Sequence, residues 1–319
     1  MSIGAFEAAR SGGFTSFHLD TDRYQLIDGN TGPRLEITTG NDLGLKSLHS
    51  RITLDLIACA NECRHLSAGR NWQPYLPLAR HLLDHREEEQ EIHAALHGGR
   101  GLFPRGSVPV SPEDWLKALD QPFHLPEKAA NMAAELGLVR KSDYCLLPDG
   151  TRNELAELSA ARESQIRISD YDRRRMAATE PMHQAVGLLT GGWWEVVVAD
   201  AASRCGRFHD LRWSATAGIT VRDACEEDVL AVDGVQAVVV SCKRGSGSRI
   251  LPHLAELDAR ARRVGGQSTR RFLAVLHPPT PGTQPAVTQR ARELGIRMLT
   301  PEDLVEPEQA FEPCGFEQH

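Results

Sequence analysis

The stretch that decides the fold reads Asp223-Ala-Cys-Glu-Glu-Asp-Val-Leu-Ala-Val-Asp-Gly-Val-Gln-Ala-Val-Val-Val-Ser-Cys-Lys243. Two valine-rich runs flank the pair Asp233-Gly234, and an Asp-Gly pair between short apolar runs is typical of a β-hairpin. Antiparallel pairing would bring Asp228, near the start of the first strand, and Lys243, at the end of the second, to the open end of the hairpin. A carboxylate and a lysine at that end could hold a divalent metal ion and steady an attacking water.

The composition is that of an ordinary globular protein, with 41% hydrophobic and 25% charged residues in a chain of 319. That length is enough for about two or three domains. The net charge of −7 gives no overall basic character, so a nucleic-acid surface would have to be local. No apolar run approaches the roughly 18 residues of a membrane span, and no signal peptide is evident. The seven scattered cysteines predict free thiols and a cytoplasmic location.

The pair Gly191-Gly192 is expected to interrupt the secondary structure. From residue 193 onward, helical and strand patterns alternate along the sequence on both sides of the hairpin. The order helix, strand, hairpin, helix, strand, helix, strand predicts an α/β domain with a mixed sheet. The expected helices are Trp193–Arg204, Ile250–Val264 and Ala286–Leu294, and the expected strands are Asp210–Ala215, Phe272–Leu276 and Ile296–Leu299.

The middle of the chain has the element order of a winged helix. Ser111 is a plausible N-cap for a helix that begins at Pro112. A second helix over Pro126–Leu136 is followed by two short strands, Leu138–Arg140 and Tyr144–Leu147. Such a module can bind DNA, or it can act only as a spacer or a dimer contact.

Helical patterns also cover 43–60 and 72–96, and the second carries several polar residues that invite a functional interpretation. Its glutamates are most simply a solvated helix face. Histidines four residues apart could bind zinc, but no further ligands complete the pattern, so packing or surface histidines are the simpler interpretation. These residues are Glu87, Glu88, Glu89 and Glu91, the pairs His81/His85 and His93/His97, and the similarly weak set Cys59, Cys63 and His65.

The chain opens with a helical pattern over Ile3–Ala9 and two strands, Phe14–Leu19 and Tyr24–Ile27. A helix of an α/β fold normally follows a strand of the same sheet. Here no strand precedes it.

A metal-dependent site for phosphodiester cleavage needs oxygen ligands and a nearby cation. Asp228 and Glu226 could supply carboxylates, with Glu195 from the preceding helix and the backbone carbonyl of Cys242. Lys243 would be the cation. The alternative is that these are ordinary surface residues of a hairpin.

The segment 243–271 has a local excess of positive charge. It contains eight basic residues, opposed only by Glu256 and Asp258. Arg244, directly after the hairpin, and Arg249, five residues further on, are candidates for contacts with nucleic-acid phosphates. A solvated basic helix face is the alternative.

Several motifs, in this order, resemble those of one nuclease family. They are Gly-Gly-Trp-Trp-Glu (191–195), Glu-Glu-Asp-Val (226–229), Val-Val-Ser-Cys-Lys-Arg-Gly (239–245), Gly-Gly (265–266) and Arg-Ala-Arg-Glu-Leu-Gly-Ile (290–296). The family is that of CRISPR ancillary nucleases, in which a CARF sensor domain precedes a PD-(D/E)xK, restriction-endonuclease-like domain.

The resemblance implies a homodimeric, Mg²⁺- or Mn²⁺-dependent nuclease that cuts DNA or RNA and is activated by cyclic oligoadenylate in type III CRISPR defence. It assigns catalytic roles to Glu195, Asp228 and Lys243, with Asp228, Glu195 and the Cys242 carbonyl as metal ligands. The implied domains are a partial, Rossmann-like CARF remnant (1–70), a helical and winged-helix linker (71–185) and the nuclease domain (186–319). The first residues resemble the tail of a CARF domain, so the front of the sensor, with its ligand loop, is expected to be missing.

The chain departs from the family pattern at Ser241, where the family has a glutamate. Serine is neutral, so the site loses one charge, which Glu226, Glu227 or Glu195 could replace. Two alternatives therefore stand beside the active nuclease. One is a weakened homologue that still binds nucleic acid, and the other is a winged-helix binding or dimerisation protein without enzymatic activity.

Overall fold

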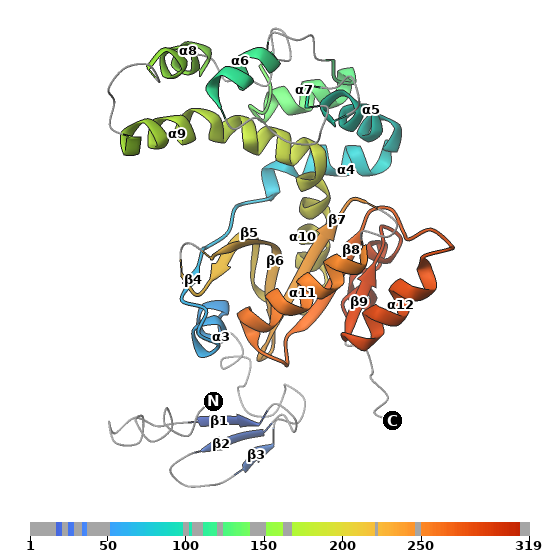
Figure 1. The fold of residues 1–319 in the computed structure, drawn as a ribbon. Helices are drawn as coiled ribbons and strands as arrows, with labels where there is room; N and C mark the ends of the chain where they lie inside the picture. Colours follow the sequence, from blue (N-terminus) through green and yellow to red (C-terminus); the bar gives the residue numbers. More distant parts are fainter. Residues whose placement is uncertain are drawn as a thin grey trace. The chain divides into compact units, whose positions relative to one another are not determined.

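The computed structural model describes residues 17–20, 25–28, 34–36, 52–97, 102–103, 111–119, 124–140, 151–161, 168–220, 223–245 and 250–312. Figure 1 shows its helices and strands. The contacts divide the chain into two compact units. One unit comprises Met1–Arg70, Ala202–Ser241 and Gly245–His319, and the other comprises Asn71–Ala201 and Cys242–Arg244. The domain boundaries expected at 70/71 and 185/186 stay predictions.

A mixed six-stranded sheet forms the centre of the first unit, with the strand order β4-β5-β6-β7-β8-β9 (Figure 1). Strands β4 to β7 pair antiparallel, whereas β8 and β9 pair parallel. This confirms the predicted α/β fold with a mixed sheet. The strands are β4 (His65–Leu66), β5 (His209–Gly218), β6 (Cys225–Asp233), β7 (Gln236–Lys243), β8 (Arg270–Val275) and β9 (Ile296–Leu299).

The hairpin predicted from the Asp-Gly pair is present as β6 and β7. Its register runs from Asp233↔Gln236 at the turn to Val229↔Val240 near the open end. Gly234 has φ of 62°, a left-handed conformation that glycine adopts without steric cost. The turn at Asp233-Gly234 therefore fixes the register of the hairpin, and the register determines which residues lie at its open end.

Helix α11 (Ile250–Gly265) covers one face of this sheet. Its buried residues recur at spacings of three and four, which places them on one side of the helix. They join a core with Leu230, Val232 and Val239 of the hairpin. The helix ends against β7, because a Cβ added at Gly265 would lie 2.4 Å from the Cβ of Ala237. The motif Gly265-Gly266 thus has a packing reason. Helix α12 (Gln284–Glu293) follows β8.

The segment before residue 70 also contributes to this sheet. Helix α3 (Leu54–Ala60) packs against α11, and β4 pairs with β5 at the edge. Asp210 accepts a hydrogen bond from the backbone amide of Leu54 at 2.7 Å, and Arg212 donates to both Asp55 and Asp210. These contacts tie α3 to β5 across a long sequence separation.

A small antiparallel sheet, β1-β2-β3, lies closer to the start of the chain. Strands had been expected over Phe14–Leu19 and Tyr24–Ile27, and two of the observed strands lie close to those positions. The opening helix expected over Ile3–Ala9 lies outside the described residues. The strands are β1 (Phe17–Asp20), β2 (Gln25–Asp28) and β3 (Arg34–Glu36).

The second unit is mostly helical, and the last residues of α10 belong to the first unit. Ser111 accepts a hydrogen bond from the amide of Asp114 at 3.1 Å, so it caps α6 as predicted. The strand expected over Leu138–Arg140 is wrong, because these residues form a turn after α7; Tyr144–Leu147 lies outside the described residues. The helices are α4 (Leu76–Asp84), α5 (Arg86–His97), α6 (Pro112–Leu119), α7 (Glu127–Glu135), α8 (Thr151–Ala161), α9 (Ile168–Gly187) and α10 (Trp193–Arg204).

The break expected at Gly191-Gly192 is also wrong. A π-helical turn, η2 (Leu188–Gly192), joins α9 to α10, so the backbone stays helical. Close packing explains one glycine, since a Cβ at Gly192 would lie 3.3 Å from the carbonyl oxygen of Gly187. π-turns inside helices are frequent at functional sites. Among the described helices, none is both long enough and apolar enough to cross a membrane.

Candidate active site

At the open end of the hairpin, a serine hydroxyl forms a hydrogen bond with an aspartate carboxylate. Beyond the last paired residues, Val229 and Val240, the next positions are Asp228 on β6 and Ser241 on β7. The hydroxyl of Ser241 donates a hydrogen bond to Oδ2 of Asp228 at 3.2 Å. Ser241 is buried, and Asp228 is partly exposed. The residue that departs from the family pattern therefore contacts the proposed catalytic carboxylate.

The two glutamates beside Asp228 have different environments. Glu226 is exposed and accepts a hydrogen bond from the hydroxyl of Ser214. Glu227 is only 4% exposed, and Nε of Arg260 donates to it at 3.0 Å. Glu226 thus remains on the surface near the hairpin end, whereas Glu227 is held by an ion pair to α11.

Burial raises the pKa of Glu227 to about 7, although the charge of Arg260 opposes this shift. The negative charge of Asp228 raises it further. A carboxyl group in this position is close to balance between its protonated and ionised forms at neutral pH. The pair with Arg260 makes Glu227 a poor substitute for the missing glutamate at 241.

Ser214 of β5 has a strained backbone next to these acids. Its φ is 51°, which is uncommon for a residue with a side chain. In this conformation the Ser214 hydroxyl donates a hydrogen bond to Glu226. Strained backbone is often found at functional sites, and sequence patterns do not reveal it.

The other predicted site residues belong to the second unit. Glu195 lies in the first turn of α10 and is partly buried. Cys242 is buried, and Lys243 is the last residue of β7. Asp228 belongs to the other unit, and its convergence with Glu195 and Lys243 stays a prediction. Arg249 lies outside the described residues.

The donor atoms at the hairpin end can be compared with the needs of a metal ion. Within the described ranges, no group of three or more His, Cys, Asp or Glu side chains is placed to hold a metal. Mg²⁺ prefers oxygen, keeps several waters and often takes only one or two carboxylates together with substrate phosphates. The carboxylate of Asp228 fits this chemistry, whereas the neutral hydroxyl of Ser241 is a poor substitute for a second carboxylate.

Comparison with known proteins places few constraints on the chain. No protein-family model matches it, and no curated protein matches it. One similar solved structure is that of Can2 from Sulfobacillus thermosulfidooxidans in complex with cyclic tetra-adenylate, with 11% identity over 97% of this chain and 70% of that chain and a TM-score of 0.45. Another is protein VC1899 from Vibrio cholerae, with 15% identity over 96% of this chain and 70% of that chain and a TM-score of 0.46. At these values the likeness carries no functional argument.

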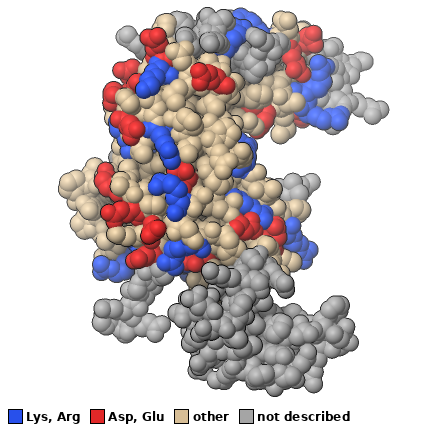
Figure 2. Space-filling model, turned by 180° about the vertical axis from the view of Figure 1, so that it is seen from behind, with Lys and Arg blue, Asp and Glu red and all other residues tan. Residues whose placement is uncertain are grey.

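The basic excess over 243–271 is partly neutralised in the described part of the chain. Five of its eight basic residues form ion pairs, several with acids that lie outside the segment. On the face shown in Figure 2, acidic and basic residues are interspersed and neither sign forms a continuous patch. The pairs are Arg244–Glu89, Arg260–Glu227, Arg262–Asp258, Arg270–Asp233 and Arg271–Asp258.

The polar residues of α4 and α5 are not one solvated face. Glu89 is 1% exposed and accepts a hydrogen bond from Nε of Arg244. Glu88 contacts Nε2 of His81 at 2.8 Å, and the rings of His81 and His85 lie 4.2 Å apart. These contacts favour the packing interpretation of the histidines. The sequence analysis did not predict that Glu89 is buried. Ile92, an apolar residue three positions further along the helix, was the available signal, because residues three apart share a helix face.

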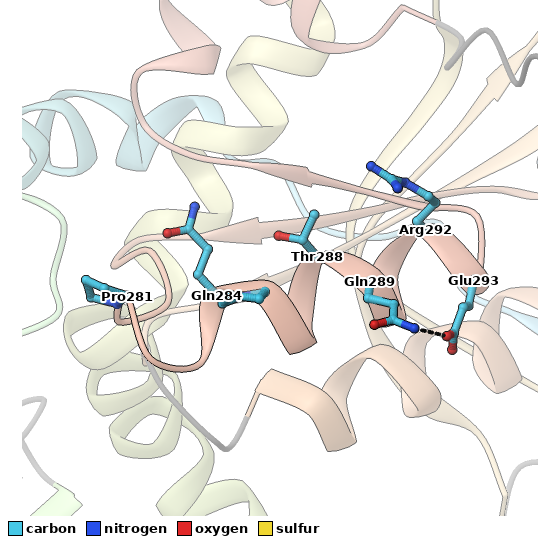
Figure 3. Close-up of a pocket in the computed structure, with 7 residues that line it drawn as sticks. Pro281, Gln284, Thr288, Gln289, Arg292 and Glu293 are labelled. Carbon is cyan, nitrogen blue, oxygen red and sulfur yellow. Dashed lines mark hydrogen bonds between the residues drawn. The ribbon is translucent and has the colours of Figure 1, made fainter.

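A hollow of about 670 Å³ lies along α12 and the loop before it (Figure 3). Gln284, Thr288 and Arg292 are among its lining residues, and Gln289 donates to Glu293 at 3.1 Å. None of the predicted site residues lines it. Its walls belong to one helix and one loop, so it offers no convergent set of catalytic groups.

Proposed function

We propose that the chain is a divalent-metal-dependent endonuclease that hydrolyses phosphodiester bonds of DNA or RNA in type III CRISPR defence and is activated by cyclic oligoadenylate. The observation that supports this best is the β6–β7 hairpin, where Asp228 lies near the start of one strand and Lys243 ends the next. The surrounding order, α10, β5, β6, β7, α11 and β8, is the one that the motif resemblance leads us to expect.

In this proposal Asp228, Glu195 and the backbone carbonyl of Cys242 hold Mg²⁺ or Mn²⁺, and Glu226 is a further acid on the same strand. The bound ion would supply Lewis acidity and a water of lowered pKa. Lys243 provides a positive charge for the phosphate in the transition state. Arg244 and Arg249 are proposed to contact the nucleic-acid backbone, and a homodimer is the expected assembly.

The test uses purified protein with Mn²⁺ and three substrates: supercoiled plasmid, single-stranded DNA and single-stranded RNA, each with and without cyclic tetra-adenylate. We expect cleavage by the wild type and none by Asp228→Ala or Lys243→Ala. Asp233→Ala, at the opposite end of the hairpin, is the matched control and should still cleave. Equal cleavage by all four proteins would reject the assignment of the site.

A second function is favoured by one specific contact, the hydrogen bond from Ser241 to Asp228. A neutral hydroxyl stands where the family has a charged ligand, and even outer-shell losses at metal sites cost about 10–100-fold. The second proposal is therefore a nuclease homologue that binds nucleic acid but cleaves it weakly. Retardation of nucleic acid in a gel without cleavage would support it, whereas a protein that neither binds nor cuts would indicate the non-enzymatic winged-helix alternative.

A further inference from the structure

Glu89 stands apart from the other glutamates of α5. Its neighbours Glu87 and Glu91 are exposed, whereas Glu89 is 1% exposed. Its Oε1 accepts a hydrogen bond from Nε of Arg244, a residue 155 positions away in the sequence. A fully buried carboxylate beside Ile92 and Leu96, on the buried face of α5, indicates a specific role for this one position.

The energetic balance of this pair argues against a role in stability alone. Removing a carboxylate from water is costly, and a buried ion pair repays that cost only when all of its hydrogen-bonding atoms are satisfied. Oε2 of Glu89 is buried and has no hydrogen-bond partner among the residues that the structure describes. The pair is therefore better explained by the geometry that it imposes than by the free energy that it contributes.

The geometry that it imposes concerns the end of β7. Arg244 directly follows Lys243, the last residue of the strand. The Arg244 side chain is 22% exposed and is held at its Nε by a carboxylate on a packed helix. An anchor on residue 244 restricts the backbone of residue 243, and hence the direction in which the lysine amine points.

The Arg244 guanidinium also affects the pKa of a second residue of α5, His93. Burial, followed by the positive charge of Arg244, lowers the pKa of His93, which lies one turn after Glu89. His93 is therefore held toward its neutral form, and the Glu89 carboxylate supplies the negative charge on this helix that binds Arg244.

We infer that Glu89 is a positioning residue, which acts through Arg244 to fix the orientation of Lys243 at the end of β7. This inference rests on the proposed nuclease function, in which Lys243 contacts the substrate phosphate. Displacing a catalytic group by about 1 Å can cost about 100-fold in rate. The expected signature is a loss in kcat with little change in KM.

The test compares Glu89→Gln with Glu91→Gln, an exposed glutamate on the same helix, at a temperature well below the unfolding transition. We expect Glu89→Gln to lower kcat about 10- to 100-fold with KM within about twofold, and Glu91→Gln to match the wild type. The double variant Glu89→Gln/Arg244→Gln should be no slower than the slower single variant, since both remove the same contact. A lower melting temperature with unchanged kcat would overturn the inference.

Two further measurements separate this inference from the proposed function. The chain has only five lysines, so ¹⁵N-lysine labelling yields few amide signals, and the Lys243 signal is assigned from Lys243→Arg. Glu89→Gln should shift that signal and Glu91→Gln should not, even if the wild type cleaves no substrate. Glu89→Asp, which keeps the charge but shortens the side chain so that the contact to Nε of Arg244 is lost, should shift it as well and serves if Glu89→Gln does not fold. An unshifted Lys243 signal in both variants would reject the positional link.

Discussion

The acidic residues at the two ends of the β6–β7 hairpin accept hydrogen bonds from different kinds of donor. At the turn, Asp233 accepts hydrogen bonds from Arg207, at 3.1 Å, and from Arg270. At the open end, serine hydroxyls donate to Glu226 and Asp228. An arginine neutralises the charge of a carboxylate, whereas a hydroxyl orients the carboxylate and leaves its charge in place. The difference indicates that the turn acid maintains the fold, whereas these hydroxyls leave the charges of Glu226 and Asp228 in place, as the proposed function requires.

The largest effect should come from removing the open-end acid. Asp228→Ala should reduce cleavage about 1,000-fold or more, because the loss of a direct ligand exceeds the 10–100-fold cost of outer-shell losses. Initial rates on labelled DNA and RNA in Mn²⁺ would measure it. If Asp228→Ala and Asp233→Ala slow the reaction equally, the contrast between the two ends disappears.

Glu227 should make stability depend on pH. Its folded pKa, about 7, lies above the ordinary value of 4.5, so its protonated form favours the folded state. That contribution is fully present below about pH 4.5 and is lost as the pH rises toward 7, by about 3 kcal/mol in all. Glu227→Gln cannot titrate, so its free energy of unfolding relative to the wild type should increase over this range.

Urea unfolding at several pH values, with EDTA present, would measure this difference. Glu256→Gln is the matched control, because Glu256 also accepts a hydrogen bond from Arg260 but is half exposed. Parallel stability curves for the wild type and Glu227→Gln would show that the pair with Arg260 outweighs the burial of Glu227.

A substitution of the acid at the turn end should lower the free energy of unfolding and leave the cleavage activity of the folded protein unchanged. Asp233→Ala leaves Arg270, whose side chain is 12% exposed, without this acceptor, and should lower the free energy of unfolding by about 1.5–3 kcal/mol. Glu302→Ala, at an exposed position, should change it by less than about 0.5 kcal/mol. Equal urea midpoints for the two variants would contradict the structural role of the turn acid.

The smallest expected effect concerns the missing charge. Ser241→Glu should raise cleavage about tenfold or more, and Mn²⁺ should raise its melting temperature further than that of the wild type. Ser241→Ala separates the added charge from the lost hydrogen bond and should show neither gain. If Ser241→Glu and Ser241→Ala behave alike, the open end does not bind a metal through this position.

Much of the α/β fold could be predicted because its signals are local. The Asp233-Gly234 pair predicted the hairpin turn, and helical spacing predicted α10 and α11 close to their observed bounds. A wing strand was expected after α7 from a short apolar run, but such runs do not distinguish a strand from a turn. Gly191-Gly192 was expected to break a helix, because glycine propensity says nothing about a π-turn supported by packing.

The candidate site was harder to predict because its environment comes from distant segments. The segment 243–271 has an excess of basic residues, yet Glu89, Glu227 and Asp233 neutralise part of it from outside that segment. The sequence likewise placed Ser241 at a site position without showing its hydrogen bond to Asp228. Pairing across the sheet determines such contacts, and a one-dimensional count does not contain it.

The π-turn before α10 has a consequence for how the chain tolerates insertions and deletions. Each residue of an α-helix turns the chain by about 100°. Five residues in a π-turn cover about the same rotation as four residues in an α-helix, so removing one residue between Leu188 and Gly192 would let the turn become regular with little rotation of Glu195. Removing one residue from the regular part of α9 would instead rotate Glu195 by about 100° around the helix axis, so the wide turn is the place where this helix tolerates a change of length.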